Sequence, residues 1–391
     1  MSLRRVPVGI VVVLLLLAGC SAPATVPPGS PPGAQECVPA PAAETEFRFA
    51  RNVAITPGPG YRVLTVKQPY PGAAPQSLVL LSCDAPAPAL PPELVGAGVL
   101  RTPVTGVFSG STTQLPFVSE LGVLDRLTGV ADPALVSDPA VLARIDGGGV
   151  TTFAPGGITN AEKVIAAAPD VLLSQGTDDP AFPALRAARI PVVGWADYLE
   201  AGPLGQAEWI KVMGALTGRD AEAAAEFDAI AQRYTDLAAQ VRGQAPTPIL
   251  VGQPMQGTWN VPAGSSTAAT LFRDAGASWS GTGASGVGTL PRSLEAVLAA
   301  DGGARIWLAD GPWQTTADIA STDPRLTRVA AAGPGGQIWT RDKLLGPGGG
   351  NQIFERGVAH PEEILADLIA ILHPQLLPGH ELVYYRRISA G

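Results

Sequence analysis

Short apolar runs alternate with amphipathic stretches through most of the chain beyond residue 104. The apolar runs are expected to form buried strands at residues 107–108, 127–130, 169–173, 190–194, 249–251, 306–308 and 338–339. The amphipathic stretches are expected to form helices at residues 115–121, 164–165 and 182–188, and from about residues 268, 293, 323 and 361. Alternation at this spacing is typical of βαβ units around a parallel sheet. The pattern therefore predicts an α/β fold with two Rossmann-like lobes.

Two further helices are predicted between these lobes. Residues 209–216 show helical apolar spacing after Pro203, which suits a first helical turn. Residues 220–243 carry one continuous apolar stripe, and Asp220 is able to cap its start. At 1.5 Å per residue this helix would be roughly 34 Å long. A rigid helix that joins two lobes leaves a cleft between them, and such a cleft is the expected ligand site.

The part of the chain before residue 104 differs in pattern. Residues 47–82 are β-like, with strand character at 61–67 and 78–81 between Pro/Gly turns, and predict a β-hairpin extension. Residues 21–45 hold seven prolines and almost no large apolar residue, which is typical of a spacer. The expected organisation is a signal peptide, a spacer, an N-terminal lobe with the β extension, a connecting helix and a C-terminal lobe, with bounds 1–19, 20–46, 47–219, 220–243 and 244–391.

The first twenty residues have the features of an export signal. Arg4 and Arg5 precede a short apolar run at 10–18, which is too short to span a bilayer. Residues 17–20 read Leu-Ala-Gly-Cys and resemble the bacterial lipobox, which implies cleavage before Cys20 and a lipid on its sulfur. The alternative is an ordinary signal with an incidental cysteine. The expected location is the outer face of the bacterial cell membrane, held there by the lipid anchor.

The other two cysteines, Cys37 and Cys83, are expected to form a disulfide, because exported proteins usually pair such thiols. Two free or buried thiols are the alternative. The formal net charge of −8, with only four lysines among the basic residues and no basic run, argues against a nucleic-acid partner. Three histidines and three cysteines argue against a multi-ligand zinc site, and no metal ligands are assigned.

Common catalytic motifs are missing from the sequence: there is no HExxH, GxxxxGK[ST], SxxK or CxxC. Residues 281–286 match GxGxxG, but no clear strand precedes them, so a loop is expected. No catalytic residue is nominated, and the predicted role is binding rather than catalysis. A secreted hydrolase whose catalytic residues are distant in sequence is the remote alternative.

The candidate binding residues follow predicted strands. Aromatic side chains there would suit a cleft that grips a large, flat, partly apolar ligand, although each ring could equally belong to the core. These aromatic candidates are Trp195, Tyr198, Trp259, Trp313 and Phe354. The polar candidates are Ser109, Thr112 and Thr113 in the turn after the first strand. Arg341 is a candidate partner for a ligand carboxylate, with a surface ion pair as the alternative.

Several stretches together resemble a known family. They are residues 107–113, 121–130, 160–172, 203–211, 350–358, 365–374 and 383–386. Over residues 47–387 the chain resembles the substrate-binding proteins of ABC importers for iron–siderophore complexes and vitamin B12, which have two α/β lobes joined by a helix. The resemblance implies a monomer that captures an iron–siderophore complex and delivers it to an ABC permease dimer with its ATPase. Corrinoid or heme cargo and a non-transport envelope sensor are the alternatives. No resident cofactor is implied, since the metal arrives as a ferric chelate.

The same resemblance assigns Glu162 and Glu295 to docking on permease arginines. Each glutamate also lies in a first helical turn, where an acidic residue ordinarily compensates the helix dipole. The chain departs from the branch pattern at Gln206, where arginine is usual, and at Gln114, where histidine often stands. If these two positions face the ligand, the cargo is expected to be less anionic.

Overall fold

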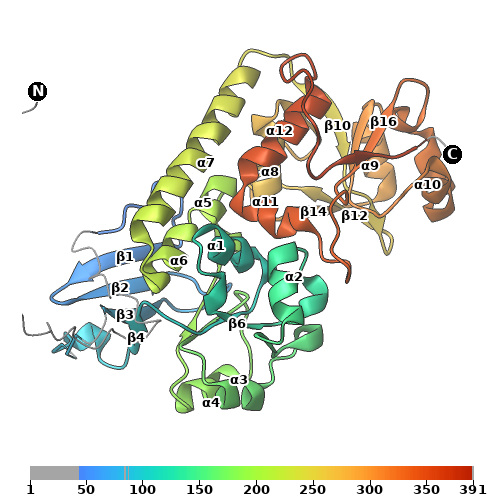
Figure 1. The fold of residues 1–391 in the computed structure, drawn as a ribbon. Helices are drawn as coiled ribbons and strands as arrows, with labels where there is room; N and C mark the ends of the chain where they lie inside the picture. The colour runs from blue at the N-terminus through green and yellow to red at the C-terminus, as the bar shows by residue number, and fades with distance from the viewer. Residues whose placement is uncertain (1–43, 83–84, 87, 390–391) are drawn as a thin grey trace, which may run out of the picture. The chain divides into compact units, whose positions relative to one another are not determined.

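The computed structural model describes residues 44–82, 85–86 and 88–389, which belong to one compact unit (Figure 1). The predicted signal peptide, most of the spacer, Cys20, Cys37 and Cys83 lie outside the described residues. The lipid anchor and the disulfide therefore remain predictions.

A four-stranded sheet opens the described chain. Its strands, in the order in which they lie side by side, are β1 (Val53–Gly58), β2 (Tyr61–Val66), β3 (Gln76–Ser82) and β4 (Gly98–Thr102). The first three pair antiparallel, and β4 pairs parallel with β3. The predicted hairpin, with strands at 61–67 and 78–81, is present as the antiparallel pair β2 and β3. The sequence pattern did not reveal β1 and β4, which extend this hairpin on either side into a four-stranded sheet.

The N-terminal lobe is built on a parallel sheet with the strand order β7-β6-β5-β8-β9. These strands are β5 (Val107–Ser109), β6 (Leu127–Val130), β7 (Thr151–Thr152), β8 (Val171–Leu173) and β9 (Val192–Val193). Its helices are α1 (Leu115–Glu120), α2 (Pro139–Asp146), α3 (Ala161–Ala167) and α4 (Phe182–Ala187). The apolar runs predicted as strands are buried here because both faces of a parallel sheet are covered.

The C-terminal lobe repeats this plan with the strand order β13-β10-β15-β16-β17. Its strands are β10 (Thr247–Val251), β13 (Ala277–Ser278), β15 (Ile306–Ala309), β16 (Gln337–Thr340) and the antiparallel edge strand β17 (Arg386–Arg387). Its helices are α8 (Thr267–Asp274), α9 (Leu294–Asp301), α10 (Thr316–Thr322), α11 (Arg356–Ala359) and α12 (Pro361–Leu372). A small sheet is formed by β11 (Pro254–Met255), β12 (Thr258–Pro262) and β14 (Thr289–Arg292). The helix expected from residue 323 is a short 3-10 segment, Pro324–Arg328.

Three helices follow the first lobe: α5 (Pro203–Ala207), α6 (Ile210–Thr217) and the long α7 (Asp220–Val241). The predicted stripe of α7 is buried, and the helix packs against α6 and α12 (Figure 1). Asp220 does not cap α7 as expected. It is the first helical residue, and its carboxylate pairs with the buried Arg62 of β2 at 2.5 Å. The predicted fold class, α/β with parallel sheets in two lobes, is confirmed.

Buried carboxylates fasten both ends of the described chain. Glu208 accepts hydrogen bonds from the backbone N–H groups of Arg48, Phe49 and Ala50 at 2.7–2.9 Å. Glu200 accepts the next two, from residues 51 and 52. We call Glu200 and Glu208 the N-terminal clamp. At the other end, the fully buried Asp367 accepts the N–H groups of residues 383–385.

Candidate functional site

The first half of the candidate site is the turn after β5. Gln114 is fully buried there, and its amide donates to the carbonyl of Ser174 after β8 at 2.7 Å. Its oxygen accepts from the Ser109 hydroxyl and from the N–H of Gly110. Gln114 therefore joins the ends of two neighbouring strands and does not face a ligand. Its departure from the family pattern carries no information about cargo charge, which corrects the inference from sequence.

A cavity of about 110 Å³ lies at this end of the N-terminal sheet. Ser109 and Thr112 both line it, together with Asp132, Leu135 and Gln175. The hydroxyl of Thr113 lies 3.2 Å from that of Ser111 and also bonds to the carboxyl of Asp197. The structure thus brings the three polar candidates into one turn at the carboxyl end of the sheet, where open α/β sheets bind their ligands.

Asp197 was not found from sequence. Its side chain is buried, and this burial raises its pKa to about 6 against the opposing effect of the Thr113 hydrogen bond. Oδ2 of this carboxyl has no hydrogen-bond partner among the described residues. The only sequence signal for Asp197 is its place between the candidate residues Trp195 and Tyr198.

Tyr198 is 44% exposed, so its ring is available to a ligand. Its hydroxyl donates to the carbonyl of Gly176 at 2.7 Å. A Cβ on Gly176 would lie 2.5 Å from the ring, and Gly176 has φ +73°, so only glycine lets the ring lie flat against this turn. Tyr198 is therefore held in place at the carboxyl end of β9.

The three tryptophan candidates differ from the expectation. Trp195, Trp259 and Trp313 all lie in the hydrophobic core, where they leave almost no ring surface for a ligand. Trp195 packs against the rings of Phe117 and Trp209. The indole N–H groups of Trp259 and Trp313 are bonded within the C-terminal lobe. All three rings therefore belong to the core and do not form a wall of the cleft.

The second half of the candidate site follows β15 and β16 in the C-terminal lobe. Arg341 pairs with Asp310 at 2.8 Å, and its guanidinium carbon lies 4.7 Å from the centre of the Phe354 ring. Phe354 is 49% exposed. We call Asp310, Arg341 and Phe354 the Arg341 cluster. It presents a cation and an aromatic face together, and Arg341 makes the ion pair that was weighed as its alternative role.

The two lobes meet through a buried glutamate and a glycine-rich loop. Glu355 accepts hydrogen bonds from the N–H and the hydroxyl of Ser137 and from the N–H of Asp138. Burial raises the pKa of Glu355 against these bonds. Within the loop 346–350, Cβ atoms on the three glycines Gly346, Gly348 and Gly350 would each lie within 2.6 Å of a carbonyl oxygen of residues 134–136. A cavity of about 180 Å³ beside this contact is lined from both lobes.

His360 forms a second bridge between the lobes. Its ring lies 2.6 Å from Glu120 of α1 and 3.1 Å from Glu362 of α12. Burial lowers its pKa, but the hydrogen bonds to the two glutamates outweigh burial and raise the pKa to about 9. His360 is therefore charged at neutral pH and joins the lobes by an ion pair on each side.

The pKa of His360 in the folded chain exceeds its unfolded value of about 6.5. The ion pairs of His360 therefore contribute their full stabilisation below pH 6.5, and this stabilisation is lost as the pH rises through 9. The shift corresponds to about 3 kcal/mol. We expect the gap in unfolding free energy between the native chain and the His360→Gln variant to shrink by about this amount from pH 6 to pH 9.5. Urea unfolding at several pH values measures the gap. A gap that stays constant over this range would contradict the prediction.

Glu162 and Glu295 occupy matching places in the two lobes. The two parallel sheets share one strand order: β6-β5-β8-β9 in the N-terminal lobe corresponds to β13-β10-β15-β16 in the C-terminal lobe. Helix α3, which precedes β8, therefore corresponds to helix α9, which precedes β15. Each glutamate is exposed in the first turn of its helix. Glu295 pairs with Arg325 at 2.6 Å, whereas Glu162 has no ion pair within residues 44–389 as described. The backbone N–H at the helix start, followed by Arg325, lowers the pKa of Glu295.

Helices of βαβ units run back along the sheet, so the N-terminal ends of α3 and α9 point toward the carboxyl edges of the two sheets. Both glutamates therefore lie on the side where the candidate site opens. No cluster of three or more His, Cys, Asp or Glu side chains that could hold a metal ion occurs in the described part of the chain. None of the helices described there is long and apolar enough to cross a bilayer.

Comparison with known proteins identifies the family of the chain. A family model described as periplasmic binding protein matches residues 107–332. A periplasmic heme-binding protein from Pseudomonas aeruginosa is 22% identical, with a TM-score of 0.54. The match covers 73% of this chain and 99% of that one. A possible iron-binding periplasmic solute-binding protein from Staphylococcus epidermidis is 15% identical, with a TM-score of 0.55. The match covers 70% of this chain and 100% of that one.

The Helicobacter pylori CeuE structure with bound Ni(II) is 14% identical, with a TM-score of 0.54, and 72% of this chain covers 88% of that one. No curated protein matches the chain in sequence. At these identities the structural likeness shows the fold, while the family match extends over more than half of the chain. The chain belongs to the periplasmic binding protein family.

Proposed function

We propose that this protein captures an iron–siderophore complex between its lobes and delivers it to an ABC permease. The observation that supports the proposal is the presence of two partly exposed aromatic side chains and a cation at the carboxyl ends of the two parallel sheets. Tyr198 lies on the N-terminal lobe, and Phe354 with Arg341 lies on the C-terminal lobe. Iron chelates that carry carboxylates and apolar arms would be held by such a set. The role is solute binding without bond-making.

Cargo of this size needs more room than the two cavities at the lobe edges. They measure about 110 and 180 Å³, whereas small-molecule sites span roughly 300–1,000 Å³. We infer that cargo enters when the loop 346–350 separates from residues 134–136. The glycines of the loop approach the backbone of residues 134–136, and the side-chain bonds beside them are those of Glu355 to Ser137 and Asp138 and of Gln352 to Ser137, so the separation breaks few side-chain hydrogen bonds.

Heme or a corrinoid is the second candidate cargo. Two of the structures that share the fold are named as periplasmic heme-binding proteins, from Pseudomonas aeruginosa and Vibrio cholerae. A flat macrocycle with carboxylates would also suit aromatic faces beside Arg341.

Titration separates these cargoes. We expect a ferric hydroxamate or ferric catecholate to change the tryptophan fluorescence of the native chain with a Kd of about 1 μM or below. The variants Phe354→Ala and Arg341→Ala should each bind at least about 10-fold more weakly, because each removes one contact of the Arg341 cluster. Val95→Ala, which removes an exposed apolar side chain elsewhere, is the matched control.

Saturable binding of heme or cobalamin, with no response to either ferric chelate, would replace the siderophore assignment by its alternative. Failure of all four ligands would overturn the proposed function. Export and lipid attachment at Cys20 are part of the same proposal, since capture outside the cell requires the protein to remain beside its permease. The Glu162 and Glu295 pair is the proposed docking surface.

A further inference from the structure

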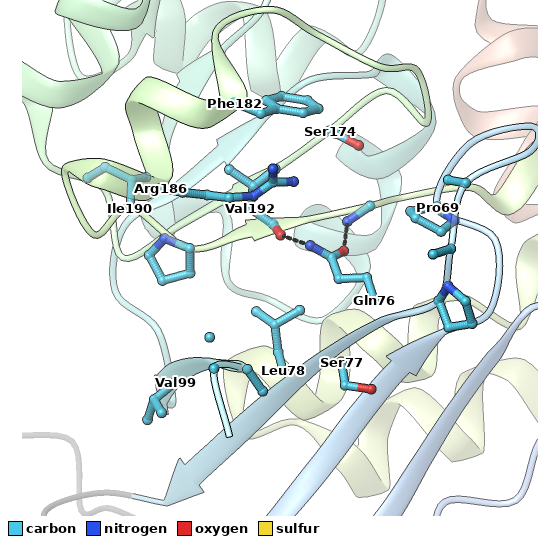
Figure 2. A pocket seen from close by; sticks show the side chains of 18 of the residues that line it. Pro69, Gln76, Ser77, Leu78, Val99, Ser174, Phe182, Arg186, Ile190 and Val192 are labelled. Carbon is cyan, nitrogen blue, oxygen red and sulfur yellow. Dashed lines mark hydrogen bonds between the residues drawn. The ribbon is translucent and has the colours of Figure 1, made fainter. Parts of the chain in front are cut away.

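A cavity of about 670 Å³ lies between the four-stranded sheet β1–β4 and the N-terminal lobe. None of its lining residues belongs to the Arg341 cluster. Figure 2 shows β3 and its neighbours on one side and the end of α4 with β9 on the other. Its volume falls in the range of small-molecule sites, roughly 300–1,000 Å³. One wall comes from residues 69–78 and 96–99, which precede the part of the chain that matches the family model. This wall therefore lies outside the part of the chain that the family model matches.

Specific contacts hold the two walls together. The amide of Gln76 donates to the carbonyl of Val192 at 2.6 Å, and its oxygen accepts from the N–H of Gly194 at 2.7 Å (Figure 2). One side chain therefore satisfies the free edge of β9 much as another strand would. A Cβ on Gly194 would lie 2.2 Å from Cβ of Pro69, so the glycine is needed for this close approach. The cavity is preformed by these contacts.

The lining is apolar on several sides. Leu78, Phe182, Ile190 and Val192 back the cavity but are themselves almost fully buried, so the apolar surface open to a ligand comes from Tyr70, Ala74, Pro75, Ala97 and Val99. Val99 stands at the cavity with 47% of its surface exposed, which is unusual for a strand valine beside a buried core. An apolar chain placed here would cover that surface and gain the corresponding hydrophobic stabilisation.

Two cations complete the lining, and none of its residues is acidic. Arg186 and Arg189 line the cavity, both are exposed, and neither has an ion-pair partner within the described residues. The Arg186 guanidinium lies 5.9 Å from the centre of the Phe182 ring and extends into the cavity in Figure 2. The lining therefore joins a positive end to an apolar surface.

Arg189 adds an independent observation. It follows helix α4 in the left-handed conformation, at φ +62°, where its N–H bonds to the carbonyl of Arg186 and the next N–H bonds to that of Leu185. These bonds form a Schellman motif, whose left-handed position is normally occupied by glycine because a side chain there is strained. The chain carries an arginine at this strained position, on the cavity wall.

We propose that this cavity binds a long-chain carboxylate, a free fatty acid, with its carboxylate on Arg186 and Arg189 and its hydrocarbon chain against Val99 and the exposed Ala74 and Pro75. Paired guanidinium groups suit a carboxylate because they offer charge-assisted hydrogen bonds. The apolar lining suits an alkyl chain and excludes a small inorganic anion as the preferred ligand. This site is separate from the proposed cargo site and would work whether or not a chelate is bound.

Calorimetric titration of the whole chain with laurate, below its critical micelle concentration, tests the proposal. We expect laurate to bind saturably, with one molecule per chain. Dodecanol, which lacks the charge, and acetate, which lacks the hydrocarbon chain, should each bind at least about 10-fold more weakly than laurate. The double variant Arg186→Ala/Arg189→Ala and the cavity-filling variant Val99→Trp should each weaken laurate binding by at least about 10-fold. Arg242→Ala, which removes an exposed arginine at the end of α7, should leave it unchanged.

Circular dichroism melting of each variant separates loss of the site from loss of the fold. Cargo titration of the double arginine variant separates this proposal from the proposed function, because its cargo affinity should equal that of the native chain. Absence of laurate binding to the native chain, or equal laurate affinity in the native chain and both cavity variants, would overturn the inference.

Discussion

Replacing Glu208 with alanine is expected to lower the free energy of unfolding by at least about 3–5 kcal/mol. Glu208 is fully buried and accepts three backbone N–H groups, from residues 48–50, as well as the Lys211 ammonium at 2.8 Å. Alanine would leave three N–H groups without their acceptor, that of Ala50 in a buried place, and would remove the carboxylate beside the buried Lys211, which keeps only the Glu46 carbonyl. Unpaired buried groups cost far more than a missing surface contact. Urea unfolding followed by far-ultraviolet circular dichroism measures the loss.

Two matched variants sharpen this prediction. Glu208→Gln keeps one acceptor oxygen but removes the charge opposite Lys211, so its loss should lie between those of the native chain and Glu208→Ala. Glu93→Ala removes an exposed glutamate and should change stability by less than about 0.5 kcal/mol. If Glu208→Ala unfolds at the same urea concentration as Glu93→Ala, the clamp does not stabilise the fold as described.

Reversing both docking charges, with Glu162→Arg and Glu295→Arg, is expected to reduce uptake of the cargo by about 100-fold or more. The two side chains stand in corresponding first turns of the two lobes and are exposed. If permease arginines meet them, the reversed pair places like charges together at both contacts, which costs several kcal/mol. Transport of radiolabelled ferric chelate into cells that express the permease measures the effect.

The single variants should differ from each other. Glu295 already shares its charge with Arg325, whereas Glu162 is free of such an ion pair within the described residues, so Glu162→Arg should impair uptake more than Glu295→Arg. Glu93→Arg and Glu381→Arg reverse exposed charges elsewhere and serve as controls. Normal uptake by the double variant, with cargo affinity intact, would show that the glutamates serve only their helices.

Local patterns in the sequence predicted most of the parallel framework. Runs such as 171–173 and 306–308 are strands because a parallel sheet buries both faces, which leaves a continuous apolar signature. The stripe of α7 was likewise visible, since burial on one face repeats at helical spacing. In contrast, the parallel pairing of β4 with β3 depends on contacts across a long connection and left no local pattern.

The candidate site was predicted less completely, for a related reason. Position after a strand indicated where Tyr198 and Arg341 would lie, but it carries no information on depth, and Trp195, Trp259 and Trp313 lie in the core. The partners of buried charged groups were also hidden. Glu355 bonds to Ser137 across 218 residues, and no sequence spacing reveals such a pair.

The N-terminal clamp also determines how the fold responds to mechanical force. Along the chain, residues 48–52 come before the first strand, and their five N–H groups are held by Glu200 and Glu208. Tension applied before residue 44 loads first the bond from the Thr45 N–H to the Ile55 carbonyl of β1 and then these five bonds. Once the Thr45 bond has broken, the clamp carries the load in a protein pulled from its N-terminal end, before the load reaches the start of β1 at Val53.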